Sequence, residues 1–98
     1  MDFEFNPSKS EANRTKHGIS FEEARELWAV FGIERIVTSD PEVRWIRVGL
    51  WREKFYTAVY TLRDERVRII STRRSRKDEI KLYQLRMNNE KETEKDFN

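Results

Sequence analysis

The sequence contains no cysteine, which excludes disulfide bonds and thiolate chemistry. Its single histidine excludes a two-histidine acid–base pair and a zinc site built mainly from histidine. No apolar run approaches the ~20 residues of a membrane-spanning helix, and the acidic N-terminus lacks the apolar run of a signal peptide. Glycine-rich phosphate loops, carboxylate clusters at metal-binding spacing and nucleophile-elbow serines are also missing. We therefore expect a cytoplasmic protein that, if it is an enzyme, uses no metal, no cofactor and no covalent intermediate.

Charged residues are unusually frequent, because they form 39% of the 98 residues against 37% for hydrophobic ones. That balance favours disorder, but three Trp, three Tyr and six Phe need a core to bury them. The segment 88–98 carries four acidic residues and two lysines, so we interpret it as a charged, flexible tail or a frayed helix extension. Its charge of −2 leaves about +4 on residues 1–87, from a total of +2. One basic domain, residues 1–87, is expected, with a polyanion or an acidic protein as its partner.

Helix boundaries are well marked in the first third of the chain. Asn6 followed by proline is typical of a helix start, and Gly18 of a left-handed helix end. Ser20 and Glu23 have the spacing of a capping box, and apolar residues then recur at helical spacing to residue 31. These signals predict helices at 7–17 and 21–31, and Ser75 is expected to cap a last helix that runs to about residue 87.

Period-two patterns predict the strands. An opening strand is expected at 3–5, and residues 33–38, 45–51, 55–62 and 67–73 read as four further strands. The turns between the last three of these strands are short and polar, which indicates an antiparallel meander. The predicted fold class is α+β, in the order β-α-α-β-β-β-β-α, with two N-terminal helices and one C-terminal helix packed on one face of an antiparallel sheet.

An arginine-rich segment, residues 63–77, holds seven basic residues and two acidic ones. Arg66 and Arg68 point away from the core on a strand, where they either bind an anion or form a solvated face. Arg73 continues the buried side of the strand after Ile69, so we expect its guanidinium to emerge where the strand leaves the core. The basic residues after it flank the start of the last helix. Planar guanidinium groups beside the free N–H groups of a helix start make a phosphate clamp. The predicted phosphate-binding residues are Arg73, Arg74, Arg76 and Lys77.

Two other groups of residues have both a structural and a functional interpretation. Lys16 and His17 suit the negative end of a helix dipole, but they also suit phosphate binding or proton transfer. Aromatic residues on the strands, Trp45, Trp51 and Tyr56, can stack on RNA bases, but such residues more often pack under helices, and we expect packing.

Taken in order, these motifs resemble the BrnT family, the toxin halves of bacterial type II toxin–antitoxin pairs. The matching motifs are F-x-F-N-P at the start, N-x-x-KHGISFEEA from Asn13 to Ala24, Arg44 followed by Gly49, RIISTR from Arg68 to Arg73, and a basic helix start ending in Tyr83. The resemblance covers about residues 1–85, so the segment after residue 87 lies outside it.

The resemblance implies a RelE-like ribonuclease fold and cleavage of RNA without a metal, which inhibits translation. It implies a BrnA-type ribbon-helix-helix antitoxin that neutralises the toxin in a hetero-oligomer and supplies the operator-DNA binding. The catalytic residues it implies are Lys16, His17, Arg44, Arg73, Glu23 and Tyr83. The alternative that the residues leave open is a non-catalytic basic module that binds nucleic acid or an acidic protein.

The chemistry of such a cleavage suggests a role for each main residue. The ribose 2′-OH attacks the neighbouring phosphorus, and the extra negative charge of the transition state needs stabilisation. We expect Arg73 and Arg44 to supply it with help from Lys16, and His17 to carry the proton because its ordinary pKa is near neutrality. This scheme requires Arg73, Arg44 and Lys16 to converge in space.

Overall fold

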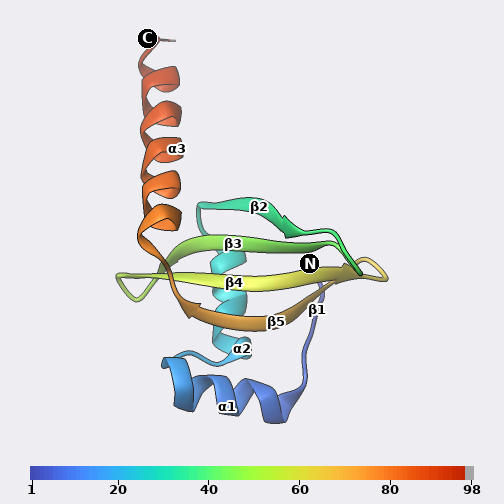
Figure 1. Ribbon diagram of the computed structural model, residues 1–98. Coiled ribbons are helices and arrows are strands. Elements are labelled where there is room, and N and C mark those ends of the chain that lie inside the picture. The colour runs from blue at the N-terminus through green and yellow to red at the C-terminus, as the bar shows by residue number, and fades with distance from the viewer. Residues whose placement is uncertain (97–98) are drawn as a thin grey trace.

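The computed structural model describes the backbone of residues 1–96 and the side chains of residues 1–89. It is an α+β domain built on a five-stranded sheet in the order β1-β5-β4-β3-β2, so the predicted fold class and element order are confirmed (Figure 1). The elements are β1 (Phe3–Glu4), α1 (Pro7–His17), α2 (Phe21–Ala24), the 3-10 helix η1 (Arg25–Ala29), β2 (Gly32–Thr38), β3 (Arg44–Trp51), β4 (Lys54–Arg63), β5 (Arg66–Arg74) and α3 (Lys77–Asp96).

The sheet is antiparallel from β2 to β5, as the short polar turns predicted. The opening strand differs, because β1 pairs in parallel with β5, with Phe3 opposite Val67. This makes the sheet mixed. The β3–β4 and β4–β5 turns each place two residues at positive φ, the backbone form of tight hairpin turns.

A β-bulge in β5 changes which residues share a face of the sheet. Tyr60 on β4 pairs with Ile69, but its neighbour Val59 pairs with Ser71, so one extra residue of β5 lies between them. The expectation that Arg73 continues the buried side of Ile69 is therefore wrong. Arg73 lies opposite Thr57, on the other face.

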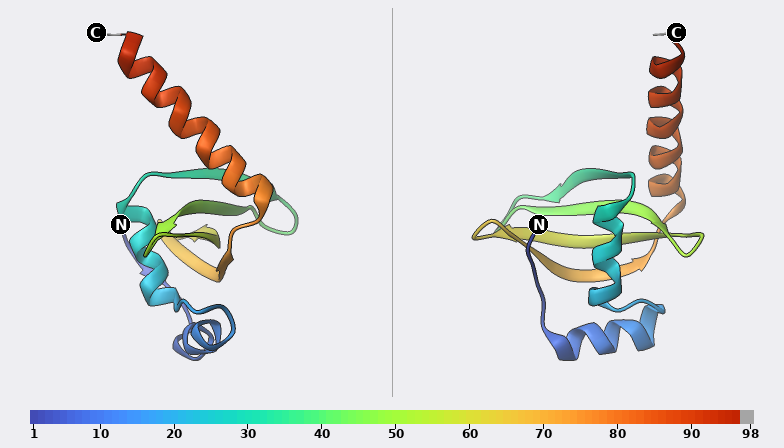
Figure 2. Two further views of the ribbon diagram at one scale, coloured as in Figure 1. Left: turned by 90° about the vertical axis from the view of Figure 1, so that its left-hand side faces the viewer. Right: turned by 180° about the vertical axis from the view of Figure 1, so that it is seen from behind.

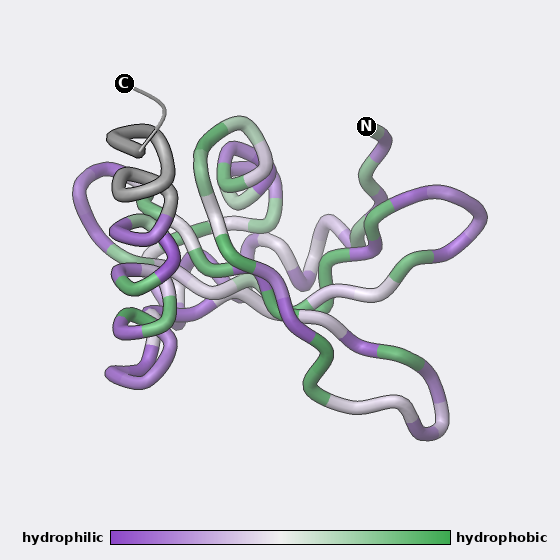
Figure 3. The backbone as a smooth tube through the Cα atoms, turned by 90° about the horizontal axis from the view of Figure 1, so that it is seen from above, coloured by the Kyte–Doolittle hydropathy of each residue, from purple (hydrophilic) through white to green (hydrophobic). Residues whose placement is uncertain are grey.

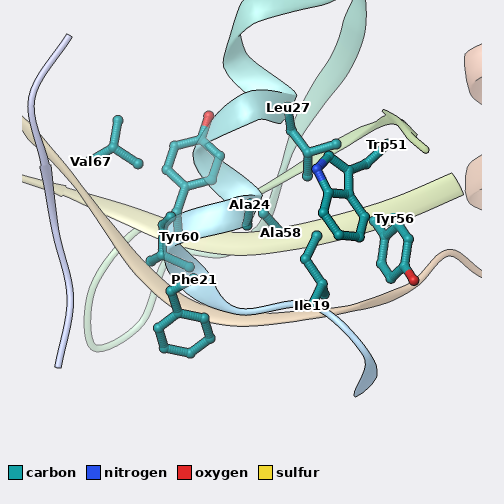
Figure 4. Packing of buried hydrophobic residues seen from close by; sticks show 10 residues of the cluster. Ile19, Phe21, Ala24, Leu27, Trp51, Tyr56, Ala58, Tyr60 and Val67 are labelled. Carbon is teal, nitrogen blue, oxygen red and sulfur yellow. The ribbon is translucent and has the colours of Figure 1, made fainter. Parts of the chain in front are cut away.

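One face of the sheet is covered by α2 and η1, which contribute Phe21, Ala24 and Leu27 to the larger core, and Ile19 joins them from the α1–α2 connection. Aromatic strand residues meet them, and Figure 4 shows Trp51 beside Tyr56 at one end of the cluster. The prediction that the strand aromatics pack rather than stay exposed is confirmed, because Trp51 is 8% and Tyr56 5% exposed.

The C-terminal helix α3 packs on the opposite face, which corrects the expectation of all helices on one face (Figure 2). Its inner residue Tyr83 contacts Phe31 and Phe55, and Ile46 and Val48 complete this smaller core. Beyond its first turns α3 projects away from the sheet (Figure 1). Its backbone is helical to Asp96, in line with a helix extension, and the flexibility of 88–98 stays a prediction.

Most predicted helix boundaries are confirmed. Asn6 accepts from two backbone N–H groups of α1, Gly18 ends α1 at φ 80°, and Ser20 forms a complete capping box with Glu23. The second helix is shorter than predicted, because the chain tightens into the 3-10 form after Ala24. The prediction that Ser75 caps α3 is wrong, because the Ser75 hydroxyl forms its hydrogen bond with the Thr57 hydroxyl, 2.7 Å away.

Asn13, the first residue of the KHG-containing motif, has a structural role. Its side-chain N–H₂ donates to the backbone oxygens of Ile19 and Thr72, both at 2.8 Å, and its oxygen accepts from the Thr72 N–H. Asn13 is 8% exposed, so these bonds join the end of α1 to β5 away from water. The motif asparagine therefore holds the KHG turn against the sheet.

We expect replacement of Asn13 by Asp to lower the free energy of unfolding by about 2–3 kcal/mol, because a buried carboxylate cannot donate to the two carbonyls. Urea denaturation measures this change. The exposed Thr15 on the same helix gives the control, since Thr15→Ala is expected to stay within about 0.5 kcal/mol of the wild type. An Asn13→Asp variant as stable as the wild type would contradict the role of these bonds.

Candidate functional site

The expected convergence of three cations at one site does not occur. Arg44 precedes Trp45, which pairs with Tyr60, whereas Arg73 pairs with Thr57. The two arginines share a sheet face, but β4 lies between their strands. They are also about 13 Å apart along β4, at ~3.3 Å per residue. Arg44 instead forms an ion pair with Glu42 at 3.5 Å.

Arg73 is engaged by Glu79, a residue that the sequence reasoning missed. Its two terminal nitrogens donate to the two carboxylate oxygens at 2.8 and 2.9 Å. Glu79 is 2% exposed and also accepts from the Thr57 hydroxyl and the Arg76 backbone N–H. Both terminal nitrogens of Arg73 therefore bond to Glu79, whose negative charge offsets that of the guanidinium.

These bonds set the charge state of the pair. Burial alone raises the pKa of Glu79, but hydrogen bonds from Arg73, Arg76 and Thr57 outweigh it and lower the pKa to about 2. The hydrogen bond with Glu79 likewise raises the pKa of Arg73. Both groups are ionised at neutral pH, and their charges cancel. The sequence did contain one signal for the role of Glu79: it lies four residues after Ser75, in the first turn of a helix that follows directly on a strand.

At the start of α3, the carboxylate of Glu79 lies against the backbone N–H of Arg76. The Arg76 N–H donates to Glu79, and the Ile80 N–H donates to the Arg76 carbonyl, so Arg76 occupies the cap position of α3. The side chains of Arg76 and Lys77 are exposed. The phosphate clamp at this helix start therefore stays a prediction, with the buried carboxylate of Glu79 beside it.

A second basic group forms around Tyr56, on the α2 side of the same end of the sheet. The Arg74 guanidinium lies over the Tyr56 ring at 5.5 Å from its centroid, and Arg52 lies over Trp51 at 4.3 Å. The two rings are edge to face, 5.6 Å apart. The buried aromatic pair thus carries one cation on each ring, from β5 and from the β3–β4 turn.

The KHG turn adjoins this aromatic pair. A Cβ atom at Gly18 would lie 3.8 Å from the Tyr56 hydroxyl oxygen, so the turn passes close to that hydroxyl. His17 is half-buried and Lys16 exposed at the end of α1. We call Lys16, His17, Arg52 and Arg74 the Tyr56 cluster. Arg52 was not predicted, and its position directly after a strand-end tryptophan was its only sequence signal.

The two remaining residues of the predicted catalytic set, Glu23 and Tyr83, both have a role in holding the fold together. Glu23 completes the capping box, where the Ser20 backbone N–H lowers the pKa of the Glu23 carboxyl. It also lies 3.7 Å from Arg14 and from Arg52. Tyr83 is 5% exposed between two phenylalanines, and burial raises its pKa. Glu23 thus contacts the Tyr56 cluster through Arg52, whereas Tyr83 belongs to the smaller core under α3.

Two further findings bear on the kind of site. Among the described residues, no three His, Asp or Glu side chains come together in a way that could hold a metal ion. No helix in the described part of the chain has the length and apolar character needed to cross a membrane. What the arrangement offers is two arginines on an aromatic pair, with the turn that follows Lys16 and His17 next to the Tyr56 hydroxyl.

Comparisons with known proteins identify the family. A comparison with curated proteins finds no match to this chain. The family of the ribonuclease toxin BrnT of type II toxin–antitoxin systems matches residues 5–79, which is well over half of the chain. The match spans the region from the start of α1 to Glu79 and includes the Tyr56 cluster. The chain therefore belongs to the BrnT family of ribonuclease toxins of type II toxin–antitoxin systems.

Proposed function

We propose that this toxin cleaves RNA without a metal and that the Tyr56 cluster is its catalytic site. One observation carries the proposal: the turn directly after the single histidine lies against Tyr56, and Arg74 and Arg52 lie over the rings of Tyr56 and its neighbour Trp51. A histidine beside several fixed cations matches the needs of RNA cleavage through the 2′-OH, which are proton transfer and charge stabilisation.

In the proposed reaction, His17 accepts the proton of the ribose 2′-OH as that oxygen bonds to the neighbouring phosphorus. The 5′-oxygen leaves and takes up a proton, and a 2′,3′-cyclic phosphate remains. Arg74 and Arg52 are held in position by the aromatic rings beneath them, so they stabilise the added negative charge with little reorganisation. Lys16 supplies a further charge from α1.

The roles of the other arginines change in this proposal. Arg73 positions the end of β5 through Glu79, next to Arg74 in the chain, instead of holding the scissile phosphate itself. Arg44 is too far away along the sheet to contact the same phosphate.

A toxin of this class acts together with a cognate antitoxin. We propose that this antitoxin is a BrnA-type ribbon-helix-helix protein, that it binds the toxin in a hetero-oligomer, and that operator DNA is bound through the complex. The RNA cleavage then inhibits translation in the cytoplasm until the antitoxin neutralises it. The net charge of about +4 on residues 1–87 supports both an RNA substrate and an acidic binding segment.

Expression of the chain alone tests the proposal. We expect growth arrest with cleaved cellular RNA, relief by co-expression of a ribbon-helix-helix protein encoded next to the toxin, and unchanged cleavage by purified toxin in excess EDTA. Loss of cleavage in EDTA would contradict the metal-independent mechanism. Salt-sensitive RNA binding with no cleavage at all would favour the alternative, a non-catalytic basic binding module.

A further inference from the structure

A polar cavity of about 450 Å³ lies at the end of the sheet opposite the Tyr56 cluster. The β2–β3 connection and the β4–β5 turn both reach this end, and both are hydrophilic at their tips (Figure 3). Four cationic residues line the cavity, and Glu42 is the one carboxylate among the described residues that do so. The cationic residues are Lys9, Arg44, Arg63 and Arg68.

Much of this positive charge is available to a ligand. Arg44 pairs with Glu42 at 3.5 Å and Arg68 with Glu4 at 3.8 Å, and all four side chains are partly exposed, so these pairs are weak. Lys9 and Arg63 are exposed and form no ion pair with any described side chain. Cations that surround one cavity repel each other, and a bound anion relieves that repulsion.

Two elements, α1 and β5, extend from the cavity to the Tyr56 cluster. α1 and β5 both run from the cavity end to the cluster end (Figure 1). Lys9, at the cavity, and Lys16, in the cluster, are seven residues apart on α1, which places them on the same side of the helix about 10 Å apart. One side of α1 therefore carries a lysine at the cavity and a second lysine at the Tyr56 cluster.

We propose that this cavity binds a backbone phosphate of the RNA outside the scissile linkage, so that single-stranded RNA lies along α1 and β5. The inference rests on the proposed ribonuclease function and extends it from one phosphate to a longer stretch of RNA. It gives Arg44 a role in RNA binding at a distance from the cleavage site. An acidic segment of the antitoxin is the competing occupant.

Binding and cleavage measured separately test the proposal. Lys9→Glu and Arg63→Glu are each expected to weaken binding of a non-cleavable 2′-O-methyl RNA of about 12 nucleotides roughly tenfold, the effect of one lost charge-assisted contact. The dependence of affinity on salt should also become less steep. Cleavage of a dinucleoside phosphate, which is too short to reach the cavity, should keep its kcat/KM within about twofold.

Arg86→Glu on α3 provides the matched control, since Arg86 is exposed and its helix leaves the sheet at the other end. It is expected to bind the long RNA as the wild type does. Unchanged binding by both cavity variants would overturn the inference, and so would an equal loss on the dinucleoside phosphate. A loss of antitoxin affinity alone would assign the cavity to the antitoxin. If the wild type cleaves neither the dinucleoside phosphate nor an unmodified RNA of the same sequence of about 12 nucleotides, the ribonuclease mechanism fails, while the binding measurement still decides the role of the cavity.

Discussion

Replacing Glu79 by Ala is expected to lower the free energy of unfolding by about 3 kcal/mol. Glu79 is almost fully buried and forms four hydrogen bonds, of which two hold the Arg73 guanidinium. Its removal leaves Arg73 without its counter-charge and the Thr57 hydroxyl without its acceptor. Loss of one partner of a buried ion pair costs about 3–5 kcal/mol, and the partial exposure of Arg73 places this case at the lower end. Chemical denaturation measures the difference.

Asp78 is the matched control for this substitution. It is the neighbouring acidic residue of the same helix turn, but it is exposed and pairs with Arg35 at 3.5 Å only. Asp78→Asn is therefore expected to change the free energy of unfolding by less than about 1 kcal/mol. Equal effects of the two substitutions would show that Glu79 acts only through the general charge of the helix start.

The same residue predicts how stability changes with pH. The pKa of Glu79 is about 2 in the folded chain and has its ordinary value near 4.5 in the unfolded chain. The stabilisation is therefore fully present above about pH 5 and is lost as the pH falls towards 2, which amounts to about 3 kcal/mol. The Glu79→Ala variant should show a smaller loss over that range than the wild type.

His17→Ala is expected to lower kcat for RNA cleavage by about 10²–10⁴, the usual contribution of a positioned acid or base. Binding of non-cleavable RNA should change little, because the neighbouring cations remain. The free energy of unfolding should also change little, since His17 lies at the end of α1 and forms no side-chain hydrogen bond with the described residues. Cleavage assays over a pH series measure the effect.

Lys16→Met provides the comparison at the adjacent position. It removes a charge and keeps the length of the side chain, so we expect weaker RNA binding and a smaller loss in kcat. If His17→Ala keeps full activity at every pH, His17 has only the structural role of a cation at the end of a helix. The toxin would then need another proton acceptor.

Local features of this protein could be predicted from the sequence, because each depends on neighbouring residues. The caps at Asn6, Gly18 and Ser20 follow from side chains that bond to their own backbone. The strands and their antiparallel order follow from alternating residues and short turns. The family resemblance, carried by motifs within single segments, is confirmed by the match over residues 5–79.

Which side chains meet across the fold depended on the tertiary structure. A bulge of one residue in β5 moves Arg73 to the sheet face on which it contacts Glu79. The alternation of residues along a strand does not show where such an extra residue is inserted. The position of α3 on the sheet face opposite α2 depends on which apolar residues pack into each of the two cores. The sequence by itself therefore determined the elements, their order and the family. Only the fold decided that Arg74 and Arg52 adjoin the KHG turn while Arg44 lies at the far end, because those distances depend on strand register and helix packing.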